Sequence, residues 1–180
     1  MLRYSLIYGG VIGVVIIAFM CAVLLVIGTD NLVASELAGY VIMLAILSLV
    51  FVGIKRFRDV EHGGVIKFTG AAGVGLGIAV VSAVFYAISW EFFLHATDFA
   101  FMETYSDSLR AAVEAENLSE TDKAAKLAEI DEGQAMYANP MFRIPISFIE
   151  IFPVGAVVAL LSALVLRNPK VLPAKANPQA

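Results

Sequence analysis

Four ionisable residues lie within or beside long apolar stretches of this sequence: Glu91, His95, Arg143 and Glu150. A charge inside a membrane-spanning segment costs several kcal/mol unless it is paired, so such residues are candidates for a functional site. Glu91 and His95 are one helical turn apart, and Arg143 and Glu150 are two turns apart. In helices, each pair would therefore lie on or near one face.

The first interpretation of these residues is a structural polar lock. Arg143 would neutralise Glu91 or Glu150, because a buried charge is tolerated when an opposite charge and hydrogen bonds accompany it. The hydrogen bonds would come from three neighbouring polar side chains, Tyr86, Ser89 and Trp90. The pattern favours this lock over the alternatives.

Two other interpretations assign the same residues a chemical role. In one, the carboxylates and His95 pass protons, a cation or a small solute. In the other, Glu91, His95 and Glu150 bind a divalent metal, although Glu-x-x-x-His without a second histidine or a cysteine is a weak metal signature. Pro153 would free the carbonyl of Ile149 beside Glu150, because proline has no N–H to donate to it.

The elements that must position these residues are hydrophobic helices. The sequence is 60% hydrophobic and 16% charged, whereas soluble domains carry about 25% charged residues. Crossing the hydrocarbon core takes about 20 apolar residues. We therefore expect an all-α integral membrane protein, with the lipid bilayer as its solvent and four transmembrane helices at about residues 6–27, 37–54, 68–94 and 144–166.

The distribution of charge predicts the orientation of these spans. With four spans, eight basic residues fall on one side, and lysine and arginine in short loops mark the cytoplasmic side. Both termini are therefore expected in the cytoplasm, with residues 167–180 as a flexible tail. The eight residues are Arg3, Lys55, Arg56, Arg58, Lys67, Arg167, Lys170 and Lys175.

Residues 95–142 are expected to form an acidic helical hairpin outside the cytoplasm, between spans 3 and 4, carrying ten carboxylates. Apolar residues recur at helical spacing on both sides of residues 117–119, which predicts two helices. Ser119 followed by Asp122 resembles a capping box, and Asn139-Pro140 should end the second helix. The hairpin is either a partner-docking or cation-attracting cap or, as charge on a helix favours, a solvated connection. The expected face of its second helix contains Leu127, Ile130, Gln134 and Tyr137.

Small residues predict where the helices approach one another. Gly9 with Gly13, and Gly73 with Gly77, have the Gly-x-x-x-Gly spacing that brings helix backbones close together. Packing within the bundle is favoured over homodimerisation, because a bundle offers each face an internal partner. Both glycine groups lie in apolar spans, so they are not nucleotide-binding loops, which need a preceding strand and a solvent-facing helix start.

Several segments resemble a bacterial membrane family known as domain of unknown function 4199. They are residues 53–59 (Gly-Ile-Lys-Arg-Phe-Arg-Asp), residues 63–68 (Gly-Gly-Val-Ile-Lys-Phe), the Ser-Trp-Glu at 89–91, and residues 137–143 and 148–155. The resemblance spans about residues 5–167. It implies a four-span protein of the bacterial inner membrane and brings no established activity with it.

The expected function is a non-enzymatic structural or assembly role in the bacterial envelope. The alternative is a small transporter or a proton- or ion-coupled protein that uses Glu91, His95 and Glu150. An enzyme is expected least, since no serine, cysteine or metal constellation of recognisable spacing is present and Cys21 is the only cysteine. No cofactor and no nucleic acid are expected. The partners would be lipid, a second copy or another membrane protein.

Overall fold

The computed structural model describes residues 1–26 and 36–174, and this part of the chain is helical without any strand. The described helices are α1 (Leu2–Val26), α2 (Glu36–Leu47), α3 (Leu49–Glu61), α4 (Phe68–Ala96), α5 (Ala100–Ala115), α6 (Glu120–Ala138) and α7 (Pro140–Leu166). The all-α prediction is confirmed for these residues.

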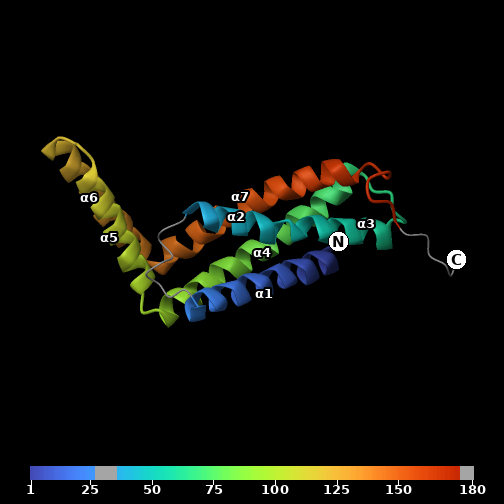
Figure 1. Ribbon diagram of the computed structural model, residues 1–180. Coiled ribbons are helices and arrows are strands. Elements are labelled where there is room, and N and C mark those ends of the chain that lie inside the picture. The colour runs from blue at the N-terminus through green and yellow to red at the C-terminus, as the bar shows by residue number, and fades with distance from the viewer. Residues whose placement is uncertain (27–35, 175–180) are drawn as a thin grey trace.

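Helix α4 is the centre of the bundle. It packs against α7 and α1 along most of its length, and α3 contacts both α4 and α7. Val74, Ile78 and Ala83 of α4 are fully buried at these contacts. The long helices lie side by side, and α1 begins where α7 ends (Figure 1). The bundle therefore has one end that carries both of these termini and an opposite end at which α5 and α6 are attached.

The α1–α4 contact is built from small residues. A Cβ added to Gly9 would lie 2.5 Å from the Cβ of Val81, and one added to Gly77 would collide with the hydroxyl of Ser5. No side chain larger than hydrogen fits at either position without separating the helices. The structure also places Gly13 against Phe85 and Gly73 beside Met1. All four glycines thus face the contact between α1 and α4.

The outer surface of the bundle is apolar. Within residues 1–26 and 36–174, three helical segments are long and apolar enough to cross a membrane: Leu2–Ala22, Phe68–Ala96 and Pro140–Leu166. Large hydrophobic side chains on each of them point outward, including Val14, Phe92 and Ile149. Contiguous apolar surface of this extent is rare on soluble monomers. It suggests a membrane protein, because such a surface is suited to contact with lipid.

The segment expected to form one unbroken span at 37–54 is divided instead. Helix α2 ends at Leu47 and α3 begins at Leu49, so neither part alone reaches the length of a span. The hydroxyl of Ser48 donates to the carbonyl of Ala45 at 2.6 Å, and such back-bonding competes with the regular helical pattern. Ser48 itself keeps helical angles, φ −58° and ψ −21°. The interruption is therefore local.

Helices α5 and α6 project from one end of the bundle (Figure 1). The chain leaves α4 through Asp98 and Phe99, which have left-handed φ values of 46° and 61°. The hydroxyl of Ser119 accepts from the backbone N–H of Asp122 at 3.2 Å, which confirms the predicted cap. Leu127, Ile130, Gln134 and Tyr137 do share the partly covered face of α6, which has no fully buried residue. We call α5 and α6 the projecting helix pair.

Ion pairs across the projecting helix pair hold its helices together. Arg110 of α5 contacts Asp131 of α6 at 2.8 Å, and Lys126 of α6 pairs with Glu116 beyond the end of α5. These pairs are solvent-exposed, so each contributes about 0–1 kcal/mol. Carboxylates still outnumber cations, so the surface of the pair is acidic.

Candidate functional site

The candidate site lies at the junction of α4, α6 and α7. The carbonyl oxygen of the Asn139 side chain accepts from the backbone N–H of Met141 at 3.0 Å and starts α7, with Pro140 in its first position. Proline is favoured there because its missing N–H would have no helical partner. Because α7 begins at Pro140 rather than near residue 144, Arg143 belongs to the first turn of that helix.

Arg143 and Glu91 form a two-pronged ion pair. The Nε of Arg143 donates to Oε1 of Glu91 at 2.6 Å, and its Nη2 donates to Oε2 at 2.7 Å. Paired, parallel hydrogen bonds of this kind are the strongest geometry available to arginine and a carboxylate. The side chain of Arg143 is 1% exposed and that of Glu91 is 18% exposed. Arg143 was predicted to pair with Glu91 or Glu150, and in the structure it pairs with Glu91.

The remaining nitrogen of Arg143 binds the end of α6. Its Nη1 donates to the carbonyls of Tyr137 and Ala138, at 3.0 and 3.3 Å. These carbonyls belong to the last turn of α6, where no helical N–H remains to satisfy them. The guanidinium carbon also lies 5.1 Å from the centre of the Phe99 ring, a favourable cation–π distance. One side chain thus joins three helices.

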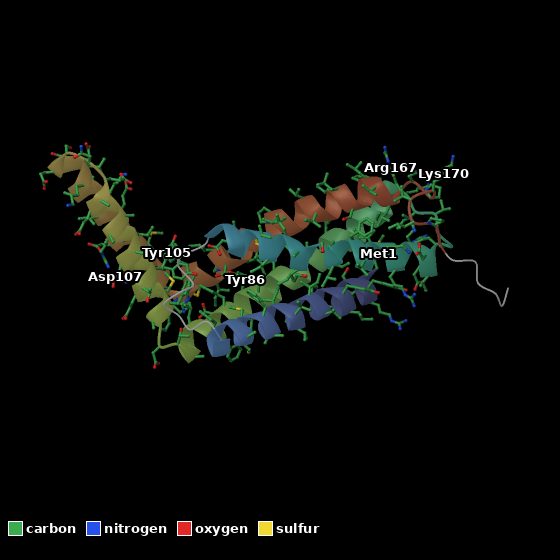
Figure 2. All side chains as sticks on the ribbon, viewed as in Figure 1. Met1, Tyr86, Tyr105, Asp107, Arg167 and Lys170 are labelled. Atoms are coloured by element: carbon green, nitrogen blue, oxygen red, sulfur yellow. The ribbon has the colours of Figure 1, made fainter. Side chains whose placement is uncertain are left out.

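Aromatic residues cover the other side of this junction. The indole N–H of Trp90 donates to the hydroxyl of Tyr137 at 2.6 Å. The Trp90 ring stacks on Tyr86 and Phe93, with ring centres 6.2 and 5.2 Å apart. Burial raises the pKa of Tyr137. In Figure 2, Tyr86 lies within the bundle and Tyr105 lies on the projecting helix pair.

His95 lies at the rim of the site. Its Nε2 is 4.0 Å from Oε2 of Glu91, and its side chain is 67% exposed. A recess of about 250 Å³ opens beside these two residues. Apart from Glu91 and His95, the lining is apolar and comprises Ala87, Ile88, Phe92 and Ile144.

The structure does not bring Glu150 to the Arg143–Glu91 pair. Two turns of helix separate Glu150 from Arg143 by about 10 Å, and the guanidinium reaches toward α4 and α6 instead. The Glu150 side chain is exposed on α7, and the ion pairs of the described residues do not include it. Nor do the described residues contain a cluster of three or more His, Cys, Asp or Glu that could hold a metal ion.

Two supporting residues, Ser89 and Trp90, differ from their expected roles. The hydroxyl of Ser89 donates to the carbonyl of Phe85 in its own helix at 2.6 Å, rather than to the Arg143–Glu91 pair. Pro153 lies in the interior of α7, as expected, and its side chain is on the exposed side of the helix. Trp90 reaches the pair only indirectly, through Tyr137.

A second buried arginine lies at the opposite end of the bundle and was not singled out from the sequence. Arg58 of α3 is 0% exposed, and its Nη1 and Nη2 donate to the carbonyls of Val171 and Leu172 at 2.9 and 2.5 Å. Its Nε donates to Asp59 at 2.7 Å. The chain just after α7 is thus bound to α3 rather than free. Residues 175–180 of the expected flexible tail lie outside the described residues.

A periodic signal could have identified Arg58. Val50, Ile54 and Arg58 are spaced four residues apart and lie on the face of α3 that also buries Phe57. A charge on the apolar face of an amphipathic helix is either functional or paired in the core. Burial acts to raise the pKa of Asp59, but hydrogen bonds from Lys55 and Arg58, and the charges of both, hold it below its usual value.

Comparison with known families agrees with the resemblance of the sequence segments. The family described as a protein of unknown function, DUF4199, matches residues 7–168. That range includes α3, α4, the projecting helix pair and α7, and therefore both buried arginines. The searches of curated proteins and of solved structures found no match. Since the match covers most of the 180 residues, the chain belongs to the DUF4199 family.

Proposed function

We propose that the protein crosses the bacterial inner membrane four times, with both ends in the cytoplasm and the projecting helix pair outside. The three long apolar helices supply three crossings. The fourth would use α2 and the first turns of α3, which continue one another across the helical Ser48. The eight basic residues on one side, in the short loops and tails, support this orientation.

Within this topology, we propose a non-enzymatic assembly role in which the bundle holds the projecting helix pair at the membrane surface for another envelope component. The observation that carries the proposal is the Arg143–Glu91 pair. Every polar nitrogen of the Arg143 side chain is engaged within the protein, either with Glu91 or with the carbonyls that end α6. Because all of its nitrogens are engaged, the Arg143 side chain fixes the orientation of α6 relative to α4 and α7.

The packing at the base of the projecting helix pair supports the same role. Phe101 of α5 packs edge-on against Trp90 and Phe93 of α4, with ring centres 5.4 and 5.9 Å apart. Trp90 also binds Tyr137 of α6. Both helices of the pair are therefore tied to α4 at their base, while their distal parts are free to meet a partner, either a second copy or another membrane protein.

The assembly role can be tested in intact cells. A photo-crosslinking amino acid at the exposed Glu129 of α6 should give a discrete crosslinked product, whereas the same probe at the exposed Val157 of α7 should contact mainly lipid. Replacing residues 106–134 by a short flexible linker removes the probe position as well, so this variant tests only whether the bundle is still inserted without the distal part of the pair, as we expect. If Glu129 gives no discrete product in cells in which the protein is correctly inserted, the assembly role is refuted.

Glu150 supports a second proposal, which is the handling of protons, cations or a small solute. It is an exposed carboxylate on an apolar helix, outside the Arg143–Glu91 pair. Intramembrane carboxylates commonly mark ion pathways. Glu150→Gln should then fold normally and abolish a proton or cation flux that the parent shows in proteoliposomes. Equal flux in parent, variant and empty vesicles would remove this alternative.

A further inference from the structure

One end of the bundle carries exposed cations that the protein itself does not neutralise. This is the end at which α1 begins and α7 ends, and Figure 2 shows Met1, Arg167 and Lys170 there. Among the described residues at this end, Asp59 pairs with Lys55 and Arg58. Glu61 accepts a 2.9 Å hydrogen bond from the hydroxyl of Tyr4 and forms no ion pair, so it contributes one negative charge against several unpaired cations. Five exposed cations of this end take part in none of the ion pairs among the described residues: Arg3, Arg56, Lys67, Arg167 and Lys170.

These cations come from separate elements that the fold holds together. Arg3 of α1 and Arg56 of α3 both lie near enough to act electrostatically on the hydroxyl of Tyr4. Tyr4 packs edge-on against Phe57 of α3 at 5.1 Å, which joins the two helices at this point. Arg3 and Arg56 therefore belong to one local surface, although they are far apart in sequence.

The backbone that carries the cations beyond α7 is also held in place. Arg58 binds the carbonyls of Val171 and Leu172, and the side chain of Asn168 accepts from the backbone N–H of Lys170 at 3.0 Å. The segment that carries Arg167 and Lys170 is thus folded against the end of the bundle. Since the fold sets the backbone positions of these cations, an anion that binds there needs to order only their side chains.

Apolar side chains adjoin the five cations. Leu2, Val60 and Leu172 are each more than half exposed at this end of the bundle. A surface that combines fixed cations with exposed apolar side chains matches a ligand with an anionic head and hydrocarbon chains. A soluble anion would use only half of that surface.

We infer that this basic end, formed by Arg3, Arg56, Lys67, Arg167 and Lys170, binds the phosphodiester head groups of anionic phospholipids in the adjacent leaflet. The inference rests on the membrane insertion in the proposed function and adds the lipid class that this end selects. Each cation near a membrane surface adds attraction to anionic lipid, and that attraction is screened by salt. Because the five cations come from different helices, they would bind several such lipids around this end of the bundle.

In the test, purified full-length protein in detergent is mixed with equal amounts of phosphatidylglycerol and phosphatidylcholine. Native mass spectrometry then measures how many molecules of each lipid the protein retains. Phosphatidylglycerol should be retained preferentially. The double variants Arg3→Gln/Arg56→Gln and Arg167→Gln/Lys170→Gln should each lower that preference by about 25-fold, at roughly fivefold per cation. The control Lys123→Gln/Lys126→Gln removes two cations from the projecting helix pair and should leave the preference unchanged. Thermal unfolding without added lipid verifies that each variant is folded.

Three outcomes would overturn the inference. Equal retention of the two lipids by the parent would show that this end does not select anionic lipid. An equal loss in the control variant would show a response to net charge alone. Displacement of the lipid by an equal concentration of soluble glycerol phosphate would show that the cations recognise a free phosphate ester. Flotation of the parent with phosphatidylcholine vesicles tests insertion separately, because a failure there would refute the proposed topology instead.

Discussion

Replacing Arg143 with leucine tests the central contact of the candidate site. Arg143→Leu keeps an apolar side chain at the start of α7 and removes the guanidinium group together with its positive charge. Glu91 is then left with an 18% exposed side chain, and the remaining basic side chain that the described residues place against it is the exposed His95, at 4.0 Å. The carbonyls of Tyr137 and Ala138 lose their donor at the same time.

The magnitude follows from these losses. Removing one partner of a buried ion pair costs about 3–5 kcal/mol. Glu91 keeps some exposure, so the low end of that range, about 3 kcal/mol, applies. For a chain of this length, each kcal/mol shifts the Tm by about 2–4 °C. The expected decrease for Arg143→Leu is therefore about 6–12 °C.

Thermal unfolding in detergent, followed by circular dichroism, measures this decrease. Arg110→Leu is the matched control, because it removes an arginine that pairs with Asp107 and Asp131 on the exposed projecting helix pair. Its effect should stay within about 1 kcal/mol. Adding Glu91→Gln to Arg143→Leu should recover part of the lost stability, since the unpaired charge is gone. The recovery should be incomplete, because the two carbonyls still lack their donor.

The reasoning fails if Arg143→Leu unfolds at the same temperature as the parent. It also fails if Arg143→Leu and Arg110→Leu lower the Tm equally, because burial would then have no influence on the energy of the pair. A third contrary result would be the absence of any recovery with Glu91→Gln. That would mean that the loss arises from the α6 carbonyls rather than from the carboxylate.

Three further predictions concern other contacts. Tyr137→Phe removes the acceptor for the indole of Trp90 and should cost about 1 kcal/mol; Trp90 is the only tryptophan, so its fluorescence emission should shift as well. Arg58→Leu should cost about 2–3 kcal/mol and accelerate tryptic cleavage just after α7, whereas equal cleavage rates would contradict the binding of that segment to α3. The pKa of Asp59 is lowered from 3.8 in the folded protein, so its contribution to stability is present above that value and lost as the pH falls below it. Asp59→Asn should therefore flatten the decrease in Tm below about pH 4, and an unchanged decrease there would argue against that contribution.

Much of the helical architecture could be predicted because its signals are local. Unbroken apolar runs indicated α1, α4 and α7, and the serine cap at 119 and Asn139-Pro140 marked the ends of α6. The interruption at Ser48 escaped prediction, because no glycine, proline or charge lies within three residues of it to mark a break in the apolar run. The hydroxyl bond of Ser48 does not account for the break by itself, since Ser82 and Ser89 make similar bonds inside the continuous α4.

The sequence predicted which residues belong to the candidate site but not which of them pair with each other. The sequence placed Glu91 near the end of one apolar run and Arg143 just before the next, where a pair could form. Whether Arg143 would choose Glu91 or Glu150 depends on the direction in which its side chain leaves the helix, and that is set by the carbonyls that end α6. Arg58 was missed because it lies among other basic residues, and all of them were interpreted as charges that determine the topology.

Both buried arginines depend on residues that the ribosome makes at very different times. Glu91 precedes Arg143 by 52 residues, and Arg58 precedes Val171 by 113. At about 5–20 residues per second, Glu91 exists for roughly 3–10 s before its partner is synthesised. During that interval neither Glu91 nor Arg58 has its final contacts. The synthesis of α7 and of the residues after it supplies the partners of both side chains. The addition of α7 is therefore the step that completes the arginine contacts at both ends of the bundle. A chain truncated before Pro140 should be a preferred substrate for membrane proteases.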